Sequence, residues 1–370
     1  MTGPSAEAAG PRSVAIISPL VDLLCVGGLS IVVIVPLLLS GREELGFITI
    51  GALIWAQALV NYSHFMASYR IIYRGREMIR RHRWAAIWVP LIMLGFVVIA
   101  LVVAPVSELL LLAFFVVGSG YLAWHYTGQV WGMMASYSYL EGIRFDPTER
   151  LLMRASLRIL LAWHVSWFLN FWLSHTGVAT LPDLAASLYR LASYAALAAF
   201  PLGGIGLLRM RLRIGRFPPL RAAVAWVAIF AWYAAVARWG LPAFFLVQLA
   251  HALQYLEFPA RVELNRAAGA TVARTAGHMA VYSAALLAAA FLVILAVPGP
   301  AMSLVANFLG ATPNNAAAAL VLYFINIHHY FTDGVIWKIS NPEVRRELFA
   351  HVAPPALVPA PARKAGARTR

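Results

Sequence analysis

Residues 14–39 read VAIISPLVDLLCVGGLSIVVIVPLLL, an apolar stretch that contains one charged side chain, Asp22. A helix needs about 20 predominantly apolar residues to cross the hydrocarbon core of a bilayer. This stretch is long enough to do so. It is also too long, and wrongly charged, for the apolar region of a signal peptide. It therefore predicts a transmembrane helix.

The whole chain has the composition of a membrane protein. Of its 370 residues, 61% are hydrophobic and 12% are charged, and the mean hydropathy is +0.75. Soluble chains carry about 25% charged residues, so disordered, collagen-like, coiled-coil and disulfide-rich folds are excluded. The single cysteine, Cys25, excludes a thiolate zinc site and a cysteine-held iron–sulfur cluster. We predict an all-α, polytopic transmembrane helical bundle.

Apolar stretches of similar length recur along the chain and predict about ten spans. Residues 1–13 are expected to form a mobile tail, residues 14–339 the transmembrane domain, and residues 340–370 a basic cytoplasmic tail that is partly disordered. Breaks rich in proline and glycine, such as residues 298–300, separate several spans. The expected spans lie near residues 14–39, 46–72, 84–105, 107–136, 151–174, 184–208, 219–238, 240–258, 276–297 and 316–339.

The net charge of +14 is explained by the distribution of the arginines and lysines. With ten spans, the tails and the loops after even-numbered spans share one side and hold nearly all of these residues, while the other side holds Arg42 and Arg238. Cytoplasmic loops are enriched in Lys and Arg. Both termini are therefore predicted to be cytoplasmic, in a multi-pass protein of the cytoplasmic (inner) membrane. The charge does not require a nucleic-acid partner.

Five of the ten histidines lie within spans, in polar segments that lipid does not favour. They fall on the second, fourth, eighth and tenth spans, which all run in the same direction, and they lie at a similar depth. A single intramembrane His usually bonds a neighbouring helix. Four helices with His in one layer instead favour a metal or haem site, because imidazole is the commonest metal ligand. The candidate ligands are His64, His125, His251, His328 and His329.

The other histidines are predicted to be interfacial or structural. His164 and His175 are expected near the outer leaflet, and His82, His278 and His351 at the basic, cytoplasmic edge of the membrane domain.

The segments around the candidate ligands contain residues that can orient them. Three pairs are spaced i, i+4 on one helix face: His125 with Gln129, His251 with Tyr255, and His329 with Asp333. A ligating His usually donates its second N–H to a carboxylate or carbonyl, so Asp333 and Glu257 are candidate orienting residues, and a carboxylate there is also a candidate ligand. Gln129, Gln254 and Glu257 are predicted to support the metal ligands from outside. Tyr255, Tyr126 and Asp333 are predicted to be catalytic. Without thiolates, the donor set suits Fe, Cu or Zn.

The size, the hydropathy and the single histidines on scattered spans resemble the bacterial membrane carotenoid-cleaving dioxygenases of the bacteriorhodopsin-related protein family. That resemblance implies a haem-free iron site with histidine ligands from several spans. Residues 251–255 also resemble the His-x-x-x-Tyr copper helix of haem–copper oxidases, and His328-His329 their His-His pair. The His-x-His haem helix and the twelve-helix fold of those oxidases are missing, so we interpret this second likeness as convergence.

These observations predict a membrane-embedded, histidine-ligated, non-haem iron oxidoreductase of the oxygenase or dioxygenase type. Fe(II) is the expected cofactor, with haem, Cu and Zn as alternatives. Dioxygen and a lipophilic small molecule that arrives through membrane lipid are the expected substrates, and an electron-donor partner is left open. The alternative functions are a haem-binding membrane electron-transfer protein and a proton or metal transporter. Tyr255 or Tyr126 is expected to stabilise an oxygen intermediate.

Overall fold

The computed structural model describes residues 15–45, 55–103, 106–107, 109–174, 180–296, 313–338 and 341–352. All regular secondary structure in these ranges is helical, and they contain no strand. The prediction of an all-α fold is confirmed. Apart from the short helices Arg76–Arg81 and Pro342–Leu348, which lie between and after the expected spans, the described helices lie within or overlap the segments that the sequence marks as apolar.

Three short π-helices interrupt the first part of the chain, and each is followed directly by an α-helix. The chain begins with α1 (Pro19–Leu23), η1 (Leu24–Gly28) and α2 (Leu29–Leu39), and continues with η2 (Gln57–Tyr62), α4 (Ser63–Ile72), α5 (Arg76–Arg81), η3 (Trp84–Trp88) and α6 (Val89–Val103). Gly27 has a φ of 141° within η1, a backbone conformation that residues with a Cβ rarely adopt.

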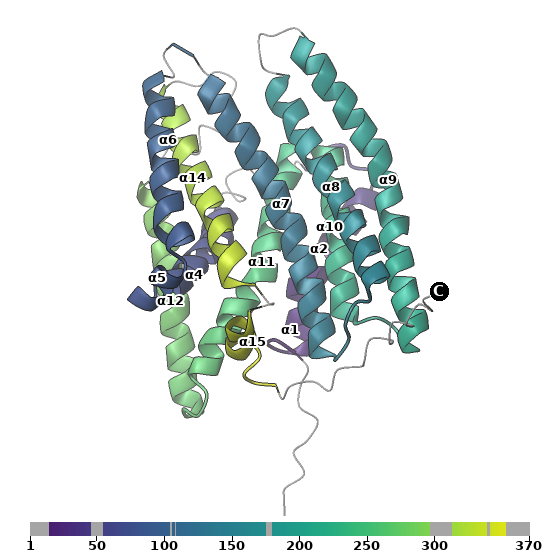
Figure 1. The fold of residues 1–370 in the computed structure, drawn as a ribbon, viewed down its shortest axis with the longest axis vertical. Helices are drawn as coiled ribbons and strands as arrows, with labels where there is room; N and C mark the ends of the chain where they lie inside the picture. The colour runs from purple at the N-terminus through teal and green to yellow at the C-terminus, as the bar shows by residue number, and fades with distance from the viewer. Residues whose placement is uncertain are drawn as a thin grey trace, which may run out of the picture.

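Longer helices form the rest of the bundle. They are α7 (Leu109–Leu140), α8 (Pro147–Leu173), α9 (Thr180–Ile214), α10 (Leu220–Trp239), α11 (Leu241–Arg266), α12 (Val272–Ala296) and α14 (Pro313–Ile336), followed by the short α15 (Pro342–Leu348). They run roughly side by side along the long axis of the molecule (Figure 1). At about 1.5 Å per residue, a helix of 25 residues spans more than 35 Å.

Four helical segments in the described residues are long and apolar enough to cross a membrane: Pro19–Leu39, Leu181–Ile214, Leu220–Trp239 and Val272–Val293. Large apolar side chains on three of them lie on the outside of the bundle, and Val32, Leu197 and Leu292 are 66–75% exposed. Exposed apolar surface of this extent is typical of lipid contact. The described chain is thus compatible with a membrane protein.

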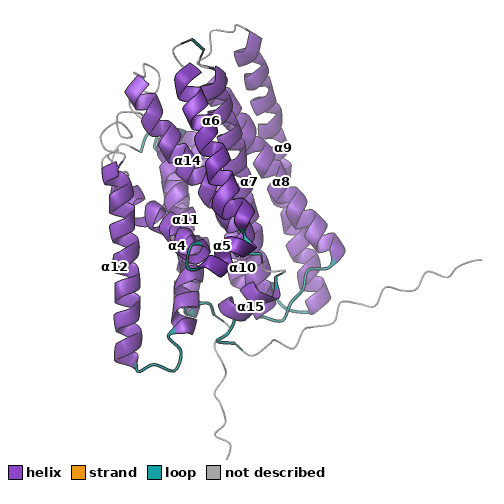
Figure 2. Cartoon of the chain, turned by 60° about the vertical axis from the view of Figure 1, so that its left-hand side comes forward, coloured by secondary structure: helices purple, strands orange, loops and turns teal. Residues whose placement is uncertain are grey.

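The helices that carry the histidines lie together in one half of the bundle. Helix α14 contacts α4, α6 and α7, while α11 contacts η2, α4 and α10. Figure 2 shows α4, α11 and α14 close together, with α12 outside them. Helices α8 and α9 pack against one another on the far side of α7, as Figure 1 also shows.

The turns α7–α8, α9–α10 and α11–α12 lie at the same end of the bundle (Figure 1), which we call the arginine-rich end. The turns and helix ends there contain Arg144, Arg213, Arg216, Arg221 and Arg266. Ion pairs join neighbouring helices at this end. Arg213 Nε lies 2.7 Å from the fully buried carboxylate of Glu149, and Arg216 Nη1 lies 3.0 Å from Glu141 Oε2.

Candidate metal centre

Four helices each bring one imidazole to a common point inside the bundle. His64 comes from α4, His125 from α7, His251 from α11 and His329 from α14. The ring centres of His64 and His329 are 4.2 Å apart, and those of His125 and His251 are 4.8 Å apart. The rings are buried, at 0–9% exposure. The sequence placed these residues at a similar depth, and the structure brings them together.

Three of the histidines and one carboxylate form a set of donors close enough to bind one ion. His64, His125, His329 and Asp333 each offer an atom, and these atoms all lie within 4.8 Å of one another. Asp333 Oδ2 is 3.1 Å from His329 Nε2 and 3.8 Å from His125 Nε2. Asp333 therefore faces the group directly, which makes it a candidate ligand as well as a candidate orienting residue.

His251 adds a fourth imidazole at the edge of this set. Its Nε2 lies 3.1 Å from Nε2 of His125. Two nitrogens that bind the same ion at about 2.0–2.1 Å are separated by roughly 3 Å at the angles that proteins use. The spacing therefore fits shared coordination, and in the absence of an ion it equally fits an N–H···N hydrogen bond.

Several polar atoms of the group have no hydrogen-bond partner among the described residues. They are His64 Nε2, His251 Nδ1, both ring nitrogens of His329, and Asp333 Oδ2. Buried polar atoms are almost always hydrogen-bonded, so a cluster of unpaired ring nitrogens beside a carboxylate oxygen fits a bound cation. Three imidazoles and a carboxylate are a donor set that suits Fe, Cu or Zn. The residues present therefore fit a bound divalent metal.

Hydrogen bonds from neighbouring residues orient two of the candidate ligands. His64 Nδ1 lies 3.2 Å from both the backbone oxygen and Oδ1 of Asn61, which leaves Nε2 free to face the group. Asp333 Oδ1 accepts hydrogen bonds from Ser68 at 2.7 Å and from Tyr255 at 3.0 Å, so its other oxygen is the one that faces the histidines. Such outer partners fix the tautomer and direction of metal ligands.

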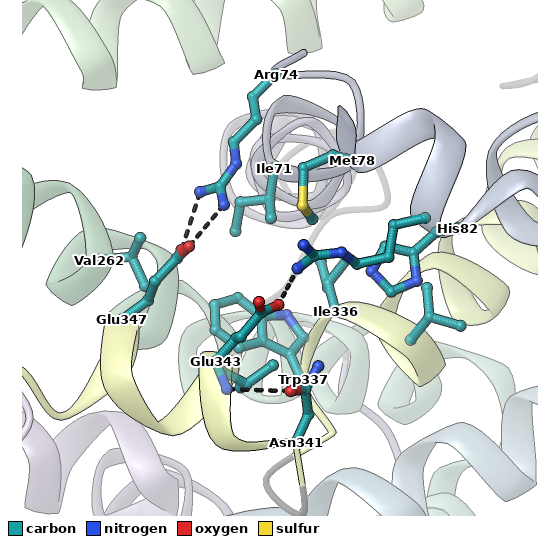
Figure 3. Close-up of a pocket in the computed structure, with 13 residues that line it drawn as sticks. Ile71, Arg74, Met78, His82, Val262, Ile336, Trp337, Asn341, Glu343 and Glu347 are labelled. Carbon is teal, nitrogen blue, oxygen red and sulfur yellow. Dashed lines mark hydrogen bonds and ion pairs between the residues drawn. The ribbon is translucent and has the colours of Figure 1, made fainter. Parts of the chain in front are cut away.

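The Tyr255 hydroxyl links the group to Trp337. Tyr255 is hydrogen-bonded to Ser68, and it accepts a hydrogen bond from Trp337 Nε1 at 2.7 Å. Trp337 also lines a cavity of about 40 Å³ beneath α15, together with Arg74 and His82 (Figure 3). Ion pairs from Arg74 to Glu347 and from Arg81 to Glu343 hold α15 over this cavity. The tyrosine predicted to be catalytic thus connects Asp333 to that cavity.

The three π-helices supply backbone carbonyls to side chains of this region. A π-helix bonds i to i+5 and occurs mostly as a short bulge near functional sites. The carbonyl of Asn61 in η2 faces His64, that of Ala85 in η3 accepts from His328 Nε2 at 2.9 Å, and that of Val26 in η1 accepts from Gln254 Nε2. The irregular backbone therefore satisfies buried polar groups that a regular helix would leave without acceptors.

Some residues that the sequence predicted for the site lie elsewhere. His328 points away from the group: it stacks on Tyr69 with ring centres 5.2 Å apart and bonds Ala85. The prediction of His328 as a ligand is not supported, because adjacent residues of a helix point about 100° apart and His329 already faces the group. Glu257 bonds Tyr137 and not a ligand.

The two glutamines and Tyr126 support His251 from outside the group. Gln129 Nε2 donates to the backbone oxygen of His251 at 2.9 Å and to Gln254 Oε1 at 3.2 Å. The Tyr126 ring packs against the His251 ring with centres 4.3 Å apart. These contacts position α11 and the His251 ring.

The remaining described histidines have other partners. His164 bonds the Tyr233 hydroxyl at 2.6 Å, His278 pairs with Glu263, and His351 bonds the carbonyl of Ala15. His82 lines the cavity beneath α15. Burial and the neighbouring Arg81 lower the pKa of His82, which favours its neutral form at pH 7. His175 lies outside the described residues.

Sequence reasoning did not identify Asn61, Ser68 and Trp337. Each lies about one helical turn from a candidate ligand: Asn61 three residues before His64, Ser68 four residues after it, and Trp337 four residues after Asp333. The same i, i+4 spacing that selected Gln129 and Tyr255 would have selected Ser68.

Comparison of the chain with protein-family models, with curated proteins and with solved structures finds no match.

Proposed function

We propose that the protein is a membrane-embedded, histidine-ligated, non-haem iron oxidoreductase of the oxygenase type that acts on a lipophilic substrate. The observation that carries this proposal is the buried group of His64, His125, His329 and Asp333, whose candidate ligand atoms all lie within 4.8 Å of one another. The apolar outer surfaces of the surrounding helices support placement in a membrane. We extend the topology to ten spans in the cytoplasmic membrane, with both termini cytoplasmic. With ten spans, nearly all basic residues lie in the tails and in every second loop, on one side of the membrane.

The mixed donor set favours iron over structural zinc. Non-haem Fe(II) oxygenases use histidines together with a carboxylate and keep positions open for substrate. Structural zinc sites are closed and four-coordinate. Here Asp333 and three histidines supply four ligand atoms. His251 would be a fifth ligand if it binds the ion, and an external ligand could take that position if His251 is instead hydrogen-bonded to His125.

The crowding of the imidazoles argues against haem. A haem iron with two histidine ligands holds them on opposite faces of a wide macrocycle. The rings of His64, His125, His251 and His329 instead lie with adjacent centres 4.2–5.3 Å apart. A porphyrin between any two of them would require the four helices to move apart.

The residues around the group suit an oxygenase that takes its substrate from lipid. Bound Fe(II) would supply a coordination position for dioxygen, held by the histidines and Asp333. The Tyr255 hydroxyl can hold or give a proton beside Asp333 Oδ1, and burial of the rings keeps bulk water away. Cleavage of a carbon–carbon double bond to two carbonyls uses both atoms of dioxygen and needs no electron donor. A donor partner is required only if one oxygen atom leaves as water.

Elemental analysis and an optical spectrum of detergent-purified protein test this proposal. We expect about one iron per chain, no Soret band, and loss of a lipophilic polyene when it is incubated with the protein and dioxygen. A Soret band would indicate haem. Metal flux across vesicles without product formation would indicate a transporter, and protein that binds no metal at all would refute the centre.

A further inference from the structure

A second buried polar cluster lies between the metal group and the arginine-rich end. Its central residue is Glu257 of α11, which is 4% exposed. Tyr137 of α7 donates a hydrogen bond of 2.6 Å to Glu257 Oε1. Glu257 Oε2 is buried and has no hydrogen-bond partner among the described residues. The proposed metal chemistry does not use this carboxyl.

The charges around Glu257 disfavour a second buried anion. Asp22 from α1, Arg221 from α10 and the Cys25 thiol from η1 are the charged and titratable neighbours besides Tyr137. The Arg221 guanidinium already pairs with two other carboxylates: its Nη1 lies 3.2 Å from Asp22 Oδ2 and its Nη2 lies 3.7 Å from Glu141 Oε1. An ionised Glu257 would face the negative charge of Asp22 and leave one oxygen without a donor. A proton on the carboxyl removes that unfavourable charge.

Glu257 belongs to a column of polar contacts between α7 and α11. His125 Nε2 meets His251 Nε2 at 3.1 Å, Gln129 meets Gln254 at 3.2 Å, and Tyr137 meets Glu257 at 2.6 Å. The three contacts follow one another in sequence on both helices. Along both helices they run from the metal group toward the arginine-rich end.

The outer end of this column reaches the surface. The Arg221 guanidinium lies over the Tyr137 ring, 5.1 Å from its centre. Glu141, which neighbours Arg221, also pairs with Arg216 at 3.0 Å, and the Arg216 side chain is 54% exposed. A proton that leaves Glu257 through Tyr137 would therefore meet Arg221, which is linked through Glu141 to the exposed Arg216.

We propose that Glu257 is a proton-binding site that carries a proton at neutral pH and exchanges it with the arginine-rich end through Tyr137. The site holds a proton one helical turn from the Gln254–Gln129 contact that supports His251. It can therefore supply or take up protons for the interior of the bundle. This inference does not depend on which metal the histidine group binds.

Infrared spectroscopy of the full-length purified protein tests the proposal. A protonated carboxyl has a C=O band at higher frequency than a carboxylate, and the band shifts in D2O. We expect such a band at neutral pH in the wild type, its loss in Glu257→Gln, and its retention in the matched control Glu141→Gln. In Glu257→Asp the band should move but persist, which covers the case in which the glutamine variant fails to fold.

Tyr137→Phe tests the route. Removing the donor to Oε1 should shift the band to higher frequency and slow its exchange after transfer to D2O. The absence of the band in wild type at neutral pH, or its persistence in Glu257→Gln, would overturn the proton site. Unchanged exchange in Tyr137→Phe would overturn the route. Wild-type protein that shows the band but binds no metal would refute the proposed function while supporting this inference.

Discussion

Asp333 uses its two carboxylate oxygens for different contacts, and this division is the clearest test of the centre at the scale of one residue. Oδ1 accepts from Ser68 and Tyr255, while Oδ2 faces His329 and His125. Asp333→Asn keeps the shape but removes the anionic donor. Loss of a residue that only supports a ligand typically lowers metal affinity by about 10–100-fold. We expect a larger fall in Fe(II) affinity here, because Asp333 is a candidate ligand itself. Anaerobic equilibrium titration measures this loss.

Ser68→Ala provides the comparison, because it removes a partner of Oδ1 and leaves Oδ2 in place. Its loss of affinity should lie within about 10–100-fold. Ser136→Ala is the matched control, since among the described residues Ser136 bonds only the carbonyl of Gly132 on its own helix. Full Fe(II) affinity in Asp333→Asn would remove this carboxylate from the site.

The neighbouring histidines of α14 make a second prediction. His329 is fully buried within the donor group, whereas His328 bonds Ala85 and stacks on Tyr69. We therefore expect His329→Ala to abolish metal binding and His328→Ala to retain it, with some loss of stability from the unpaired Ala85 carbonyl. Metal per chain and thermal unfolding in detergent distinguish the two effects. Equal metal loss in both variants would contradict the assignment.

At the scale of elements, the sequence predicts much of what the structure shows. Long apolar segments give the helices, because a helix in lipid satisfies its own backbone polar groups. His64, His125, His251 and His329 lie at a similar depth on four predicted spans that run in the same direction. This pattern predicts that the four side chains lie close together. The sequence does not predict which face of α14 turns inward, so His328 and His329 were not distinguished. Nor does it predict η1, η2 and η3, because π-helices depend on tertiary contacts.

The contact of Gln254 with η1 gives a prediction at this scale. Gln254 donates to the Val26 carbonyl and accepts from Gln129, so Gln254→Leu removes the side-chain donor to this buried carbonyl. Gln129 is half-buried and keeps its hydrogen bond to the His251 backbone oxygen, so the expected cost is that of one lost buried contact, about 1–3 kcal/mol. We expect lower unfolding stability in mixed micelles and a displaced His251, seen as weaker metal binding.

The conservative change Leu253→Met, at the adjacent position, is the control for Gln254→Leu. Because Gln129 and Gln254 are hydrogen-bonded to each other, the combined variant Gln129→Leu/Gln254→Leu should be less destabilised than the sum of the single changes. Strict additivity would show that the two glutamines act independently, and wild-type stability in Gln254→Leu would show that its contact with Val26 does not hold η1.

At the scale of the whole molecule, polar and apolar surfaces are separated along the bundle. Arginines and their acidic partners gather at the end that holds the α7–α8, α9–α10 and α11–α12 turns. Exposed leucine, valine and isoleucine side chains instead cover the sides of α2, α6, α9 and α12. A bilayer accommodates both surfaces, because hydrocarbon covers the apolar sides and the cytoplasmic face attracts arginine.

The orientation of the bundle is the last prediction. If the arginine-rich end is cytoplasmic, the opposite end, where α9 begins near Pro182, faces the other compartment. Reporter fusions at the C-terminal tail and near Pro182 should therefore report opposite sides. A third fusion in the 215–219 turn should agree with the C-terminal one, because ten spans place both on the same side. Changing the arginines around this turn to glutamine should weaken the orientation bias without altering metal content. If the C-terminal and Pro182 fusions report the same side, the number of spans is wrong, and with it the depth argument that first grouped the histidines.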